Sequence, residues 1–345
     1  MDDQEITSPY RIPGGGPDGT PGSLALDQCK KDRERKRRGY IGSQPKGKMG
    51  IPVKIGQTTL IAAPSISGSV RCSNSAYARL LSGNTHMAET SVINEFAEEM
   101  GYLFNKHALK NRTADITTLT PSEAYEVQDR FLANRVKEGA KIVGWKVGCT
   151  SAAIRHQLGL TQPISGKLLQ PDIFHSPAQL PVSSFVNCAV EPELVFRLGA
   201  DLQDEADDDQ IVAAIVGVCA GIELHNYRFW YGTPTLQELI ASNGIHAGLV
   251  LSHMKPLPPS WDIEAEQVSI LVNGDVKTTG KCAETLGNPL LSIRWLAKHA
   301  AERGQRLRSG ELVIPGSAVE LVKVEAGDRI EARFTTVGVC HLSLV

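Results

Sequence analysis

Glu191-Pro192-Glu193 is the part of this 345-residue sequence whose spacing most directly suggests chemistry. Residues two apart in a β-strand project from the same face, so the two carboxylates would point the same way. Like charges this close repel each other, and a cation between them relieves the repulsion. Carboxylate oxygens suit Mg²⁺ or Mn²⁺ better than zinc. An acidic strand facing solvent is the alternative, and spacing alone does not decide between the two.

Two further ionisable residues lie in apolar surroundings. Glu223, in Ala-Gly-Ile-Glu-Leu, follows a strongly apolar segment, and a buried carboxylate there needs a partner, either a metal ion or a basic side chain. Lys146 lies between glycines in Gly-Trp-Lys-Val-Gly, which suggests an ammonium group pointing into a cleft. Such a group could orient an anion or move protons, and a lysine reaching solvent from an edge strand is the alternative.

Several polar residues are weaker candidates, since turn chemistry explains most of them equally well. Ser242, Asn243 and His246 could line a polar pocket. Gly287 and Asn288 form a tight turn into a helix N-terminus, where an anion is favoured, and Gly316 and Ser317 follow Pro315 in another turn. His225, beside Asn226, is as consistent with a structural role as with a functional one.

The elements that must position these residues are mixed in type. Hydrophobic spacing predicts a helix over 92–103, and a capping box at Thr120 to Glu123 predicts a second helix. Strands are predicted over 142–147 and 189–198, the latter at an edge or bulge because of Pro192. A helix is predicted over 210–219, a hairpin around Asn273-Gly274, a helix over 289–304, and strands over 311–314 and 330–344. Regular βα repeats and a G-x-G-x-x-G motif are missing, which argues against a nucleotide-binding doubly wound sheet.

Composition narrows the class of protein further. The chain has 36 Lys+Arg against 38 Asp+Glu, so neither nucleic acid nor an acidic membrane surface is expected as a partner. No apolar run approaches the roughly 20 residues of a membrane span. The Gly- and Pro-rich start and the acid-free segment 35–88 predict that residues 1–86 are largely disordered. They could be an organelle transit segment or an extension upstream of Met87. We expect a cytoplasmic protein, with import through residues 35–86 as the alternative.

Taken in order, these segments resemble the 2-keto-4-pentenoate hydratase and 4-oxalocrotonate decarboxylase family of the fumarylacetoacetate-hydrolase-like superfamily. The resemblance runs from about Glu95 to the C-terminus and is specific because of the order and spacing of its segments. Those segments are 144–151, 159–166, 191–196, 222–227, 243–248, 272–274 and 286–290.

The resemblance implies an α+β fold, a mixed β-sheet roll with flanking helices, in proteins that form homo-oligomers. Residues 87–345 would be the catalytic domain, with N-terminal helices over 87–140 and the β-roll over 141–345. It implies that Glu191, Glu193 and Glu223 hold Mg²⁺ or Mn²⁺, and that Lys146 is catalytic. We add His246 and Asn243 as catalytic candidates. As substrate-binding candidates we add Ser242, Gly287, Asn288, Gly316 and Ser317.

The chemistry implied is that of a small 2-oxo acid, which chelates the cation while an enolate forms. We expect a hydratase of 2-oxopent-4-enoate in the breakdown of aromatic compounds. A decarboxylase of 2-oxo-3-hexenedioate, an acylpyruvate-type hydrolase and a non-catalytic relative are the alternatives. Two departures make water addition less secure than metal binding. Ile164 stands where hydratases often carry an aspartate, and Pro315 stands where many members have threonine. His246 or His225 could then replace the missing acid–base group.

Overall fold

The computed structural model describes residues 90–111, 114–227, 229–230 and 232–345. The expectations for residues 1–86 and for the boundary at residue 87 lie outside these residues. The helices are α3 (Thr90–Lys106), α4 (Pro121–Lys137), α5 (Ala152–Leu158), α6 (Asp208–Ala214), α7 (Leu236–Ala241) and α8 (Pro289–Glu302). Three short 3₁₀ helices are η1 (Ala114–Thr118), η2 (Val182–Ser184) and η3 (Cys282–Glu284).

The strands form two sheets. The larger, eight-stranded sheet has the order β2-β1-β10-β5-β6-β7-β3, with β11 also paired to β5. Its strands are β1 (Lys141–Gly148), β2 (Ile164–Gln170), β3 (Ile173–His175), β5 (Cys188–Leu198), β6 (Ile215–Asn226), β7 (His246–Leu251), β10 (Leu312–Ile314) and β11 (Val322–Lys323). The five-stranded sheet has the order β4-β13-β12-β8-β9. Its strands are β4 (Ala178–Leu180), β8 (Gln267–Val272), β9 (Asp275–Lys281), β12 (Arg329–Phe334) and β13 (Gly338–Leu344).

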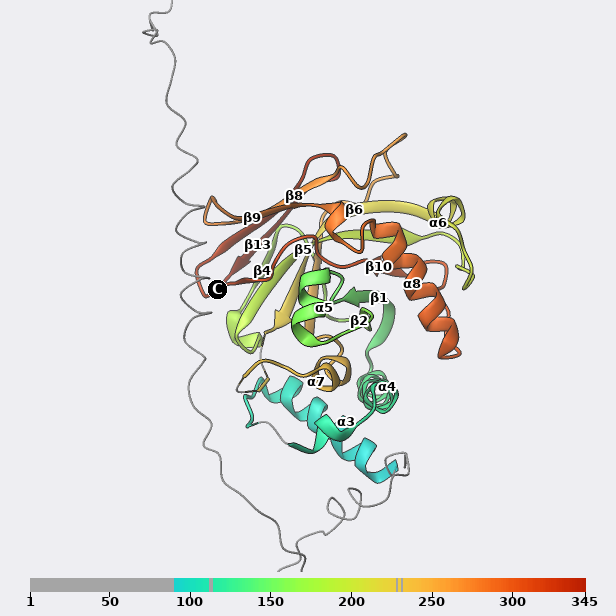
Figure 1. The fold of residues 1–345 in the computed structure, drawn as a ribbon. Coiled ribbons are helices and arrows are strands. Elements are labelled where there is room, and N and C mark those ends of the chain that lie inside the picture. The colour runs from blue at the N-terminus through green and yellow to red at the C-terminus, as the bar shows by residue number, and fades with distance from the viewer. Residues whose placement is uncertain (1–89, 112–113, 228, 231) are drawn as a thin grey trace, which may run out of the picture. The chain divides into compact units, whose positions relative to one another are not determined.

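The first two helices form where the sequence predicts them. Phe96, Met100 and Leu103 of α3 are buried on one face of the helix, as their spacing indicates. Thr120 caps α4 through the predicted capping box with Glu123. Both helices share one apolar core with α7, which comes from much later in the chain, and the three lie together below the strands (Figure 1). No helix in the described ranges is long and apolar enough to span a membrane.

The two faces of the larger sheet have different roles. Alternate residues of β5 and β6 face the main apolar core, which also includes residues of the five-stranded sheet. From the larger sheet these include Val190, Leu194, Phe196, Val218, Ala220, Ile222 and Leu224, and from the smaller sheet Val268, Ile270, Val272, Ile330, Ala332, Phe334, Cys340, Leu342 and Leu344. The intervening residues of β5 and β6 project from the opposite face. The acidic residues singled out by the sequence lie on that second face.

The hairpin prediction is confirmed, since Asn273 and Gly274 connect β8 to β9 with φ of 56° and 90°. The helix predicted over 210–219 is wrong in its second half. The chain leaves α6 at Ala214 and continues as β6 from Ile215. A continuous apolar run is typical both of a buried helix and of a strand buried on both faces, and here the β-branched Ile215, Val216 and Val218 extend into the sheet.

The edge position expected for Pro192 is also wrong. β5 lies inside the sheet and pairs with β6 along its length. On its other side, β10 pairs with 196–197 and β11 with 189–190. Pro192 lies between the segments of β5 that pair with β11 and with β10. On that side of β5, none of the described strands forms backbone hydrogen bonds with Pro192. A proline is therefore tolerated in an interior strand, because this short gap needs no backbone donor.

Candidate metal centre

The register of β5 and β6 brings the three predicted carboxylates to one face. Glu191 lies directly opposite Glu223, and Glu193 lies opposite Gly221, which has no side chain. Residues paired across neighbouring strands project from the same face, so the three carboxylates share it. The Glu191 side chain is 22% exposed, whereas that of Glu223 is 1% exposed. The opening toward solvent is therefore on the Glu191 side.

Glu193 has the environment expected of a metal ligand. Its Oε2 atom accepts a hydrogen bond from the Gly316 backbone N–H at 3.2 Å. Its Oε1 atom is buried and has no hydrogen-bond partner among the described residues. Burial, followed by the nearby Glu223 and Glu191 carboxylates, raises the pKa of Glu193 well above its ordinary value. A divalent cation would supply the missing partner and stabilise the ionised form, so these residues fit such a group.

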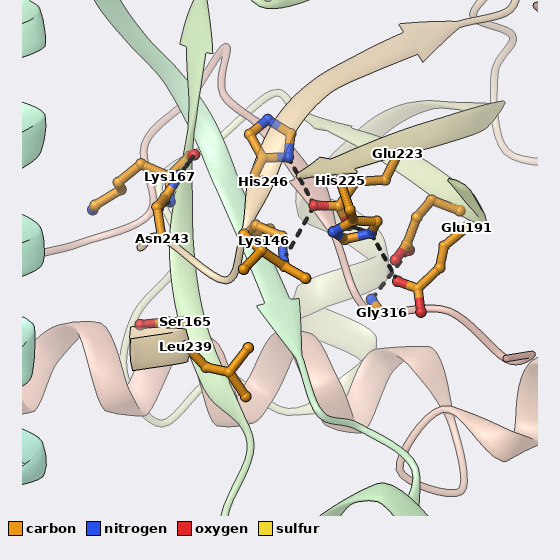
Figure 2. A network of polar contacts seen from close by, with 12 residues as sticks. Lys146, Ser165, Lys167, Glu191, Glu223, His225, Leu239, Asn243, His246 and Gly316 are labelled. Carbon is orange, nitrogen blue, oxygen red and sulfur yellow. Dashed lines mark hydrogen bonds and ion pairs between the residues drawn. The ribbon is translucent and has the colours of Figure 1, made fainter. Parts of the chain in front are cut away.

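Glu223 is fixed by two donors on a single oxygen. Its Oε1 atom lies 3.1 Å from Lys146 Nζ and 2.7 Å from His246 Nδ1. Burial raises the pKa of Glu223, but Lys146, His225 and His246 together outweigh it, so the pKa lies below its ordinary value. The carboxylate is therefore ionised, and its Oε2 atom is left to face Glu191 and His225 (Figure 2).

Lys146 reaches this cluster from β1. Its side chain is 3% exposed. Burial lowers the pKa of Lys146, but Glu223, Glu191 and Glu193 raise it further, and the net pKa is above the ordinary value. Glycines make room for the chain. A Cβ atom on Gly166 would lie 2.9 Å from Lys146 Cγ, and one on Gly244 would lie 2.8 Å from Lys146 Nζ.

His246, the first residue of β7, is buried beside Glu223. Because Glu223 is ionised and can only accept, Nδ1 of His246 carries the hydrogen. The Nε2 atom then has a lone pair and has no hydrogen-bond partner in the described chain. Burial lowers the pKa of His246 despite the neighbouring carboxylate. The ring is thus a neutral base with a free nitrogen.

His225 lies closer to the carboxylates than its sequence context indicated. Its Nε2 atom is 3.1 Å from Glu191 Oε2 and 3.6 Å from Glu223 Oε2. One ligand atom from each of these three residues lies within 4.8 Å of the others. The two-residue period of a strand predicts this position of His225, because residues 223 and 225 project from the same face. The prediction of a helix over 210–219 hides this strand period.

The other predicted site residues are only partly brought to this cluster. Gly316 donates to Glu193, and Asn243 lies next to Lys146, across Gly166. Both polar groups of Asn243 bond the Lys167 backbone, so the geometry gives Asn243 a positioning role, and catalysis by it stays a prediction (Figure 2).

The remaining candidates are engaged in local turns and caps. The Ser242 hydroxyl bonds the backbone of Leu239 and Ile245, and the Ser317 hydroxyl accepts from the Val319 N–H. Asn288, preceded by Gly287, caps α8 by accepting from the Leu290 N–H, and it also donates to Glu264. Substrate binding by Ser242, Gly287, Asn288, Gly316 and Ser317 stays a prediction, and the contacts observed for the side chains of Ser242, Asn288 and Ser317 are structural.

The two departures from the family pattern lie beside this cluster. Ile164 is buried at the start of β2, and a Cβ atom on Gly148 would lie 3.2 Å from Ile164 Cγ1 and 3.6 Å from Lys146 Nζ. An apolar side chain thus lies beside the lysine amine, at the position where hydratases often carry an aspartate. Pro315 has no N–H, and its carbonyl accepts from the Ser292 hydroxyl.

Comparison with known proteins gives consistent matches. The family model described as "Fumarylacetoacetate (FAA) hydrolase C-terminal" matches residues 151–345. A 2-keto-4-pentenoate hydratase of Paraburkholderia xenovorans is 30% identical over 217 residues, covering 63% of this chain and 81% of the relative. A 4-oxalocrotonate decarboxylase of a Pseudomonas species is 27% identical over 220 residues, covering 64% of this chain and 85% of the relative.

A solved structure resembles this one over the same region. It is 4-oxalocrotonate decarboxylase from Pseudomonas putida G7, complexed with magnesium and adipate. Its TM-score is 0.71 at 25% identity, and the match covers 75% of this chain and all of that one. The same enzyme complexed with calcium and acetate gives a TM-score of 0.70 at 26% identity.

Proposed function

Because this chain belongs to the fumarylacetoacetate hydrolase C-terminal family, we propose that it is a divalent-metal-dependent lyase acting on a small 2-oxo acid. The resemblance to the hydratase and decarboxylase family and the α+β fold are thereby confirmed. We propose 2-oxopent-4-enoate hydratase as the activity. The observation that carries the metal-dependent part is the buried, unpartnered Oε1 atom of Glu193, which no described residue satisfies, close to Glu191 and Glu223.

Glu191, Glu193 and Glu223 would hold the cation. When bound, Mg²⁺ or Mn²⁺ supplies positive charge beside the carboxylate and 2-oxo oxygen of the substrate, where negative charge develops on enolisation. Support for magnesium comes from the solved structure of 4-oxalocrotonate decarboxylase, which was complexed with magnesium. The partly exposed Glu191 leaves this end of the cluster open to a small anion.

His246 and Lys146 are suited to different parts of the proton transfer. His246 Nε2 is a buried nitrogen without a competing partner among the described residues, so it is the candidate base that would take the 2-hydroxyl proton of the dienol and return it to the distal carbon as the ketone forms. Glu223 holds the ring through Nδ1 and stabilises the imidazolium that results. Lys146 stays charged because its pKa is raised, so its ammonium attracts and orients the substrate anion. Neither role requires an acid at position 164.

A direct assay tests this proposal. The purified protein with Mg²⁺ is given 2-hydroxypenta-2,4-dienoate, and loss of dienol absorbance is followed together with formation of the hydrated product. We expect turnover that disappears with a chelator and returns with Mg²⁺. Metal binding in calorimetry without turnover on a panel of 2-oxo acids would instead favour a non-catalytic relative. Release of pyruvate or oxalate from an acylpyruvate would favour a hydrolase.

A second candidate, decarboxylation of a 2-oxo dicarboxylate such as 2-oxo-3-hexenedioate, is favoured by Lys323. This residue of β11 lies opposite Ala189, which in turn lies opposite His225, so the three side chains project from the site face. The Lys323 side chain is exposed, with Nζ 5.0 Å from the ring centroid of Tyr227. It provides a cation near the open Glu191 end, where the second carboxylate of a substrate would lie.

Measuring CO₂ and hydrated product in the same reactions separates the two candidates. A dicarboxylic substrate that yields CO₂, with little hydration of the monocarboxylic dienol, would favour the decarboxylase. The reverse pattern would favour the hydratase. The small-molecule 2-oxo acid is the partner we propose, while the homo-oligomer and the cytoplasmic location stay predictions.

A further inference from the structure

We propose that His225 is a direct metal ligand through Nε2, which makes the centre a mixed nitrogen–oxygen site rather than one built of carboxylates alone. This inference rests on the metal-dependent function proposed above. It adds a fourth protein ligand to the three glutamates, and it changes which cations the centre should prefer.

The first argument is distance. Two ligands at right angles on an ion, each about 2.0–2.1 Å from it, lie about 2.9 Å apart. His225 Nε2 lies 3.1 Å from Glu191 Oε2 and 3.6 Å from Glu223 Oε2. Small side-chain movements would bring all three atoms to such spacings, because they already lie within 4.8 Å of one another.

The second argument concerns which atoms remain available. Both donors on Glu223, Lys146 and His246, use its Oε1 atom, so Oε2 is the atom that faces His225. On Glu193, Oε2 is used by Gly316, and Oε1 has no partner among the described residues. The unused Glu223 oxygen, a Glu191 oxygen and His225 Nε2 make a compact donor set. The unused Glu193 Oε1 atom, which is not part of the group within 4.8 Å, would move toward the ion to complete three oxygens and one nitrogen.

The third argument concerns the imidazole tautomer. Without a cation, Nε2 must carry its hydrogen, because the atoms beside it are carboxylate oxygens. Nδ1 is buried and has no hydrogen-bond partner in the part of the chain that the structure describes. None of these residues donates to Nδ1 or accepts from it, so the contacts of Nδ1 fix neither tautomer and a cation at Nε2 would decide between them. With a cation between the carboxylates, the hydrogen can reside on Nδ1 and the Nε2 lone pair can point at the ion.

The consequence is a change in metal preference. Carboxylate oxygens suit Mg²⁺, whereas imidazole favours later first-row ions such as Co²⁺ and Ni²⁺. Removing the imidazole should therefore weaken Co²⁺ binding more than Mg²⁺ binding. If His225 only donated a hydrogen bond to Glu191, its removal would weaken binding of both ions by a similar factor.

The most direct test is spectroscopy of the wild-type protein loaded with Mn²⁺. Pulsed electron paramagnetic resonance detects ¹⁴N hyperfine coupling from a coordinated imidazole. We expect this coupling in wild-type protein and its loss in His225→Gln, while it persists in the surface control His341→Gln. Absence of ¹⁴N coupling from a bound Mn²⁺ in wild-type protein overturns the inference, and this result needs no variant that folds.

Calorimetric titration with Mg²⁺ and Co²⁺ provides the second test. For His225→Gln we expect Co²⁺ affinity to fall by about tenfold or more relative to any change for Mg²⁺. Equal losses for both ions would leave His225 as a positioning residue for Glu191 and would overturn direct ligation. If neither ion binds wild-type protein, the proposed metal-dependent function fails together with this inference. If both bind without nitrogen coupling, only the assignment of His225 fails.

Discussion

Glu193→Gln separates metal binding from folding, because the substitution keeps the shape of the side chain and removes its charge. The side-chain carbonyl of the introduced glutamine can still accept the hydrogen bond from the Gly316 N–H. Burial and the neighbouring carboxylates raise the pKa of Glu193, so its negative charge is unfavourable without a cation and its removal costs little. We therefore expect the free energy of unfolding of the metal-free variant to lie within about 1 kcal/mol of wild type.

The loss should appear when the cation is added. A ligand present at about 100 times its dissociation constant stabilises the folded state by about 2.7 kcal/mol. For a domain of this size, each kcal/mol changes Tm by about 2–4 °C, so saturating Mg²⁺ should raise the Tm of wild type by roughly 5–10 °C. The same addition should leave the Tm of Glu193→Gln nearly unchanged, because the ligand oxygen is no longer anionic.

Differential scanning calorimetry with and without Mg²⁺ measures both quantities in one series. The matched control is Glu95→Gln, an exposed residue of α3, which should show the full wild-type shift. An Mg²⁺-induced shift in Glu193→Gln equal to that of wild type would refute the assignment of Glu193 as a ligand. A large drop in the metal-free Tm would refute the argument that the charge of Glu193 is unfavourable without a cation.

Three further predictions follow from other parts of the structure. Burial lowers the pKa of Lys167 from 10.5 to about 7, so at this residue the unfolded chain binds one more proton between these pH values. Lys167 therefore makes stability rise with pH across that window, most visibly below pH 9, because burial raises the pKa of Cys188 and Cys340 to about 12 and their contribution above pH 9 has the opposite sign. In chemical denaturation, Lys167→Met should remove this slope of about 1.4 kcal/mol per pH unit, and Lys277→Met on the exposed hairpin should retain it. Gly244→Ala should lower both the Tm and kcat, because φ is +66° and the new Cβ would meet Lys146 Nζ; an unchanged Tm in calorimetry would contradict this. Lys323→Gln should raise KM for a 2-oxo dicarboxylate by about two- to fivefold, as expected for an exposed ion pair, and leave KM for a monocarboxylate unchanged; equal effects would remove Lys323 from the substrate site.

Local patterns were enough to predict several elements. The capping box at Thr120 places the start of α4, and Asn273-Gly274 places the hairpin, because each signal depends on neighbours in the sequence. The Glu191 and Glu193 pair could be predicted for the same reason, since a strand places them on one face. The apolar run after α6 carried no such local signal. Residues 215–219 form a strand because they pair with neighbouring strands inside the sheet, and this pairing involves residues far away in the sequence.

The relation between Glu191 and Glu223 could not be predicted from local pattern. It depends on strand register between distant parts of the sequence, and a shift of one residue would turn every side chain of β6 to the other face. The resemblance to known enzymes supplied Glu223 as a ligand without this register. It did not supply His225, because that position becomes informative only when residues 215–226 are known to be a strand.

An irregularity between β6 and β7 explains how two histidines come to face one carboxylate. Leu249 lies opposite Glu223, so an unbroken ladder would place Ala247 opposite His225 and turn His246 to the other face. The register instead shifts between Leu224 and His225, so that His246 lies opposite His225 and its Nδ1 atom reaches Glu223. A bulge of this kind re-aims a side chain without changing the rest of the strand. The candidate base of the site therefore depends on one extra residue in β7, which hydrophobic alternation along the sequence does not reveal.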